Sequence, residues 1–119
     1  MREVKYRDVG LFTDKIKINA NEAGAGGAST EYNVDLDSSE GEIRTEINFQ
    51  VGNPLENVNG ITNEALLSIL IDRMEGFNSG NFRTREGALV LTKLEEALHW
   101  MQARTMERRA RGVEGKYEK

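Results

Sequence analysis

The sequence predicts an α+β fold, with an N-terminal antiparallel β-sheet followed by a C-terminal two-helix hairpin whose last helix is long. Apolar residues alternate with polar ones through the first fifty residues, whereas beyond Asn59-Gly60 they recur at helical spacing. The length of 119 residues fits a single domain, 1–119. We expect a β-rich part over 1–51, a helical hairpin over 61–112 and a tail over 113–119.

Four short segments have the period-two pattern of half-buried antiparallel strands. The alternating apolar residues lie in 4–6, 16–18, 32–36 and 43–49. The stretch 24–30 is rich in glycine, which predicts a flexible hairpin loop. It lacks the residue spacing of a phosphate-binding P-loop.

The first helix is predicted to follow the turn at Asn59-Gly60. Thr62 is a suitable N-cap, since its hydroxyl can accept a free N–H of the first turn, and Glu64 suits the positive end of the helix. The helix is expected to end at 78–81. Its apolar face comprises Leu66, Leu67, Leu70, Ile71, Met74 and Phe77.

The second helix is predicted between a Thr84 cap and Gly112, a residue suited to a left-handed C-terminus. About 27 residues at 1.5 Å each give a length of about 40 Å. An apolar seam with alternating spacings of three and four follows this helix, and the first helix is too short to cover all of it. We therefore expect a partner subunit. The seam comprises Gly87, Leu91, Leu94, Leu98, Met101, Thr105 and Arg108.

Charge and composition exclude several functions. Residues 1–82 carry 7 Lys/Arg against 14 Asp/Glu, whereas residues 83–119 carry 9 against 6. The acidic body disfavours a general duplex nucleic-acid binder, which depends on many phosphate contacts. The longest strongly apolar run, 65–71, is far short of the roughly 20 residues of a membrane span. We expect a cytoplasmic protein without a signal peptide or a membrane partner.

The residues that catalysis needs are scarce. The chain has no cysteine, and His99 is its only histidine. Thiolate zinc sites and metal sites built on several histidines are therefore excluded, and no serine has a suitable histidine partner. We expect no enzyme activity, no catalytic residues, no metal and no cofactor.

Three arginines form a stripe near the end of the second helix. Arg104, Arg108 and Arg111 fall within about 60° of one another at 100° per residue. One interpretation is structural: they favour the negative end of the helix dipole and pair with carboxylates. The other is functional, because guanidinium groups hold phosphates with paired N–H bonds. Phe77 and Phe82 flank the connection between the helices, where they either pack locally or stack a nucleobase.

Residues 46–119 carry four blocks in a fixed order, NFQ, NGITNEAL, RTREGALVLTKLEEALHW and ARTMERRARGVEGK. In these blocks the chain resembles the first type of Thoeris anti-defence protein of phages. The resemblance covers about 74 residues, and residues 1–45 do not take part in it.

The resemblance implies a signal sponge rather than an enzyme. Members have this fold, assemble as dimers and hexamers, and bind the cyclic ADP-ribose isomers, such as glyco-cyclic ADP-ribose, that TIR-domain enzymes make during infection. They hold the signal without cleaving it in the cytoplasm of the infected bacterial host. Some also bind cyclic di- or trinucleotides of the CBASS pathway.

The family's ligand contacts map onto four positions. Phe77 matches an aromatic that stacks on the base, and Arg104 and Arg108 match arginines that face the phosphates. Gly87 is a departure, because the family has an asparagine there whose amide contacts the ligand. Neighbouring candidates are Phe82, Arg83, Arg85, Thr105 and Arg111.

Four alternatives stay open, and one of them is an enzyme that hydrolyses the signal. Gly87 favours a sponge whose main ligand is a cyclic di- or trinucleotide. A phage assembly protein that uses the long helix without binding a ligand is the second alternative, and a nucleic-acid binder is the third.

Overall fold

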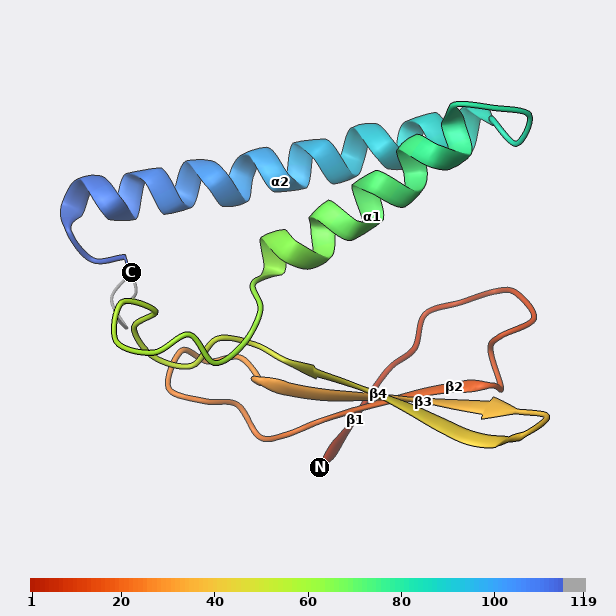
Figure 1. Cartoon of the computed structure of the whole chain (residues 1–119), viewed down its shortest axis with the longest axis horizontal. Helices are drawn as coiled ribbons and strands as arrows, with labels where there is room; N and C mark the ends of the chain where they lie inside the picture. Colours follow the sequence, from red (N-terminus) through yellow and green to blue (C-terminus); the bar gives the residue numbers. More distant parts are fainter. Residues whose placement is uncertain (115–119) are drawn as a thin grey trace. The chain divides into compact units, whose positions relative to one another are not determined.

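The computed structural model describes residues 1–114, which form two compact units, Met1–Ile61 and a second unit that begins at Thr62. The first is a β-sheet and the second a helical hairpin, so the predicted α+β class is confirmed (Figure 1). The assignment of the whole chain to one domain stays a prediction. Within the described part of the chain, no helix is both long enough and apolar enough to cross a membrane.

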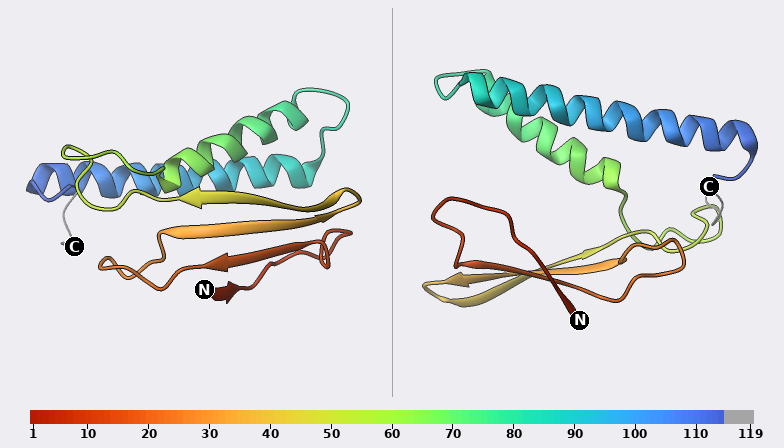
Figure 2. Two further views of the ribbon diagram at one scale, coloured as in Figure 1. Left: turned by 60° about the horizontal axis from the view of Figure 1, so that its bottom comes forward. Right: turned by 180° about the vertical axis from the view of Figure 1, so that it is seen from behind.

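The sheet is a four-stranded antiparallel meander in the order β1-β2-β3-β4, and its strands lie side by side in Figure 2. The strands are β1 (Arg2–Val4), β2 (Ile16–Ala20), β3 (Glu31–Ser38) and β4 (Gly41–Asn48). The two longest strands are joined by residues 39–40, and Gly41 follows with a φ of 109° that favours glycine. The predicted segments 16–18, 32–36 and 43–49 thus overlap β2, β3 and β4 closely, whereas β1 shares only Val4 with the predicted segment 4–6.

The register gathers the alternating apolar residues on one face. Ile18 is opposite both Val4 and Val34, and Tyr32 is opposite Ile47. Directly opposed residues share a face, so the apolar positions of all four strands lie together. Two residues of the predicted pattern lie outside the strands: Tyr6 follows the end of β1, and Phe49 forms an isolated bridge with Ile61.

The hairpin consists of α1 (Asn63–Asn78) and α2 (Arg85–Arg111), which diverge from the turn between them (Figure 1). All three predicted end signals are confirmed. The Thr62 hydroxyl accepts from the Ala65 N–H at 3.1 Å, and the Thr84 hydroxyl accepts from the Gly87 N–H at 2.9 Å. Gly112 ends α2 with a φ of 75°.

Burial along α2 follows the predicted seam. Gly87 and Arg108 are buried, and the five seam residues between them are half-buried. On α1, by contrast, Leu70 and Phe77 of the predicted apolar face remain 46% and 48% exposed. Helix α1 has 16 residues and α2 has 27, so α2 is longer by about 16 Å.

Candidate functional site

Helix α2 separates the candidate ligand residues into two groups. The hairpin-end group lies at the connection between the helices and comprises Phe77, Phe82, Arg83, Arg85 and Gly87. The arginine group lies in the last two turns of α2 and comprises Arg104, Thr105, Arg108 and Arg111. Gly87 and Arg104 are 17 residues apart in one continuous helix, which corresponds to about 25 Å. A single protomer therefore does not bring the two groups together.

Phe77 presents a partly exposed ring in the last turn of α1. The guanidinium carbon of Arg73 lies 5.5 Å from the ring centroid, an arrangement typical of a cation–π contact. Arg73 therefore occupies one face of the ring. Arg73 is not among the residues predicted from the sequence, although its position four residues before Phe77 on a helix indicates that the two side chains meet.

Gly87 is buried against the end of α1. A Cβ atom on this residue would lie 2.6 Å from Oδ1 of Asn78 and 3.0 Å from Oγ1 of Thr84. No real Cβ contact is as short as the first of these, so glycine permits the close approach of α2 to the Asn78 side chain. Asn78 is likewise not among the predicted residues, because nothing in the spacing of α1 indicates what its side chain packs on.

The other members of the hairpin-end group are exposed. Phe82 has 82% of its surface accessible, and the Arg83 N–H closes the connection by donating to the Gly80 carbonyl at 3.3 Å. Arg85 is exposed at the first position of α2. These residues surround the turn without contributing to a core.

Two members of the arginine group have structural partners. Val113 N–H donates to the Arg108 carbonyl and Gly112 N–H to the Arg109 carbonyl, both at 3.0 Å, which is the Schellman arrangement. The Arg108 guanidinium is buried and donates through Nη2 to the Val113 carbonyl at 2.8 Å. Arg111 pairs with Glu107 one turn earlier. The structural interpretation of the stripe thus accounts for Arg108 and Arg111.

Arg104 differs from these two. It is exposed, and within residues 1–114 no ion pair involves it. Thr105 beside it is half-buried on the seam. Arg104 therefore takes no part in the end of the helix, and its guanidinium retains its full set of donors for a ligand.

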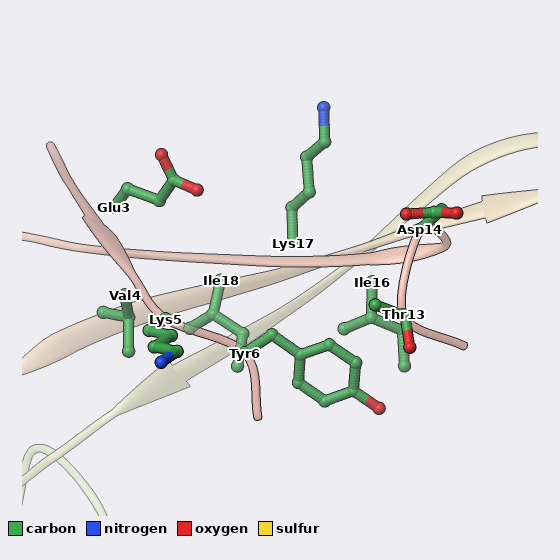
Figure 3. A pocket seen from close by; sticks show the side chains of 9 residues that line it. All are labelled: Glu3, Val4, Lys5, Tyr6, Thr13, Asp14, Ile16, Lys17 and Ile18. Carbon is green, nitrogen blue, oxygen red and sulfur yellow. The ribbon is translucent and has the colours of Figure 1, made fainter. Parts of the chain in front are cut away.

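A cavity of about 530 Å³ lies in the sheet unit, away from both groups in sequence. The Tyr6 ring lies beside Ile16 and Ile18 on one side of β2, and Lys17 points to the other side (Figure 3). The remaining lining residues are Glu3, Val4, Lys5, Thr13 and Asp14. Two lysines and two carboxylates balance each other, so this lining does not select an anion.

The sheet also carries an ion pair with two hydrogen bonds. Arg44 donates to both carboxylate oxygens of the buried Asp35, at 2.6 and 3.1 Å. This hydrogen-bonded guanidinium lowers the pKa of Asp35 below its ordinary value, although burial acts in the opposite direction. Asp35 is opposite Lys17 and Arg44 in the register, so the pair lies on the polar face of the sheet.

Comparison with known proteins identifies the family. The family model described as "Acb2/Tad1, hairpin domain" matches residues 41–106. The chain is also 44% identical over 97 residues to "Thoeris anti-defense 1" of Bacillus phage SBSphiJ7. That match covers 81% of this chain and 66% of the phage protein, just under two-thirds of its length. The chain therefore belongs to the Acb2/Tad1 hairpin-domain family of Thoeris anti-defence proteins.

Proposed function

We propose that the protein binds a TIR-produced cyclic ADP-ribose isomer, glyco-cyclic ADP-ribose, and sequesters it without cleaving it in the cytoplasm of the infected host. Family membership and the relative's printed name support an action against Thoeris immunity. The arrangement of one exposed arginine and one half-exposed phenyl ring supports a ligand with both phosphate and base. In this role the protein acts stoichiometrically, by lowering the free concentration of the signal.

The observation that carries the proposal furthest is the separation of Phe77 from Arg104 by most of the length of α2. A site that uses both requires two chains, and we infer a homodimer in which two α2 helices run antiparallel. A two-fold axis beside Ala97 sets the partner subunit's Arg104 next to Val90, one turn from Gly87. Each dimer would then have two composite sites.

The outer flank of α2 supports this pairing. Val90, Ala97, Trp100 and Arg104 lie within about 80° of one another on the helix. Trp100 is 65% exposed and Val90 is 44% exposed in the protomer. An antiparallel copy would cover these apolar side chains while leaving both arginines at the edges of the contact, where they would face a phosphate.

Within each composite site the roles divide between the two chains. Phe77 would stack the base on the ring face that Arg73 leaves open, and the partner subunit's Arg104 would hold the phosphates with charge-assisted bonds. The Arg108 guanidinium donates to the Val113 carbonyl, so Arg108 would mainly hold the C-terminal end of α2 in shape, and Arg104 would make the main contact with the phosphates. Ligand that contacts both chains would stabilise the dimer by mass action.

Calorimetry with glyco-cyclic ADP-ribose tests the proposal, followed by heating the complex to recover the ligand. Binding, together with release of chemically unchanged ligand, is the expected result, and Arg104→Ala should abolish most of the heat. Arg109→Ala is the matched control, because Arg109 lies in the same helix end but pairs with Glu114 at 3.3 Å. No binding by the unsubstituted protein, or recovery of a hydrolysed product, would refute the proposal.

A second candidate ligand is a cyclic di- or trinucleotide, which the absence of a side chain at position 87 favours. If this is the main ligand, binding of a cyclic trinucleotide should survive Arg104→Ala. An assembly protein without a ligand predicts heat from neither compound and no loss of function in the same variant. One set of titrations with the two compounds therefore separates all three functions.

A further inference from the structure

The carboxamide of Asn78 is a polar group that no described residue pairs with. Both its Nδ2 and Oδ1 atoms are shut off from solvent, and within residues 1–114 neither makes a hydrogen bond. Buried amides almost always have partners, because an unpaired donor or acceptor loses its hydrogen bonds to water without replacement. The unpaired Asn78 amide therefore calls for a hydrogen-bond partner outside the described residues, or for another explanation of its free-energy cost.

The surroundings of this carboxamide are equally unusual. Its Oδ1 atom lies 2.6 Å from the position that a Cβ on residue 87 would occupy, so any other residue there would force the carboxamide to turn away. The nearby Thr84 hydroxyl already accepts from the Gly87 N–H as the cap of α2. An asparagine on α1 and a glycine on α2 therefore combine to hold an amide that has no hydrogen-bond partner in the part of the chain that the structure describes.

Asn78 also follows Phe77 directly in the last turn of α1. A carboxamide offers one donor group and one acceptor, which matches the N7 acceptor and the 6-amino donor on one edge of adenine. We propose that Asn78 turns out of its place against Gly87 and reads this edge of the base stacked on Phe77. The inference rests on the proposed function, and it makes Asn78 the residue that selects adenine.

The movement is favourable for a physical reason. An amide that is hydrogen-bonded in the free protein would have to break those bonds before it contacts a ligand. Asn78 breaks none, so each bond formed with the base adds to affinity.

Calorimetry with two ligands tests this inference. The first ligand is glyco-cyclic ADP-ribose, and the second is the same molecule with the 6-amino group of adenine replaced by an oxo group. The oxo group accepts where the amino group donates, so it removes one of the two bonds to a carboxamide. We expect the unsubstituted protein to prefer the amino compound by about 5- to 100-fold. Asn78→Ala should bind the amino compound more weakly and lose most of the preference.

Two controls accompany the titrations. Asn81→Ala changes an exposed asparagine of the same connection and should retain the preference. Thermal unfolding of Asn78→Ala should show no loss of stability, because the substitution removes an unpaired buried amide.

The outcomes separate this inference from the function on which it depends. If the unsubstituted protein binds neither compound, the proposed function fails and the inference fails with it. If it binds and Arg104→Ala abolishes binding, the proposed function stands. Under that condition, an Asn78→Ala variant with unchanged affinities, or one weakened equally for both compounds, would show that the amide only packs between the helices.

Discussion

The guanidinium carbon of Arg73 lies 5.5 Å from the centre of the Phe77 ring, one helical turn further along α1. The contact holds the ring in one orientation and covers one of its faces. In the proposed site the base stacks on the other face, and the positive charge behind the ring would also suit an anionic ligand.

Replacing Arg73 with leucine should therefore weaken ligand binding while the hairpin stays folded. We expect about a 2- to 5-fold loss of affinity, which corresponds to the roughly 0.5–1 kcal/mol of an exposed cation–π contact. Calorimetry measures the loss, and Arg73→Lys, which keeps the cation, is the control. A full loss in the lysine variant would contradict the cation–π explanation.

The separation of Phe77 from Arg104 makes the two-chain site testable by mixing. Phe77→Ala and Arg104→Ala should each bind poorly alone, because each homodimer has the same defect in both sites. After the two variants are mixed and their subunits exchanged, half of the dimers are mixed, and each of these has one site with neither substitution. About one-quarter of all sites should then recover. Calorimetric stoichiometry measures the recovery.

The control for this experiment is a mixture of Arg104→Ala with the Phe77→Ala/Arg104→Ala double variant. Every chain in this mixture lacks Arg104, so no mixed dimer regains an intact site and binding should stay low. Recovery in this control, or no recovery in the first mixture despite demonstrated exchange, would show that Phe77 and Arg104 do not share a site across two chains.

The close approach of Gly87 to Asn78 predicts non-additive stabilities. Gly87→Ala places a Cβ against Oδ1 of Asn78, so the carboxamide must turn away, and the gain of about 1 kcal/mol expected from alanine as the better helix former should be reduced. In an Asn78→Ala background the obstacle is gone, and the same change should raise the free energy of unfolding by about 1 kcal/mol. Urea denaturation of the four proteins measures both values. Equal effects in the two backgrounds would contradict the packing of Asn78 on Gly87.

Local chemistry explains what the sequence alone could predict about the fold. Thr62 and Thr84 cap helices because their hydroxyls accept from N–H groups three residues later, and Gly112 tolerates a φ of 75°. These signals depend on neighbours in the chain. The seam of α2 was predictable for the same reason, since helical periodicity fixes which residues share a side.

The details of the candidate site depend on contacts that spacing does not determine. A helical wheel groups Arg104 with Arg108, but it does not show that Arg108 bonds to the Val113 carbonyl whereas Arg104 has no such role. The fit of Asn78 over Gly87 depends on how closely two helices approach. The wheel also says nothing about distance along the axis, so it did not reveal that one chain keeps Phe77 and Arg104 apart.

The Asp35–Arg44 pair predicts how the stability of the sheet depends on pH. Arg44 holds the pKa of Asp35 below its ordinary value of about 4, so the carboxylate binds protons more readily in the unfolded chain. The pair therefore stabilises the fold above about pH 4, and this contribution is lost as the pH falls through the lowered pKa of the folded state.

Arg44→Gln should reduce the free energy of unfolding at pH 7, and the gap in this free energy between the variant and the unsubstituted protein should narrow below pH 4. Urea denaturation across this range measures the gap, with Arg83→Gln, an exposed arginine outside the sheet, as the control. A gap that is constant with pH would show that Arg44 acts by packing rather than through the charge of Asp35.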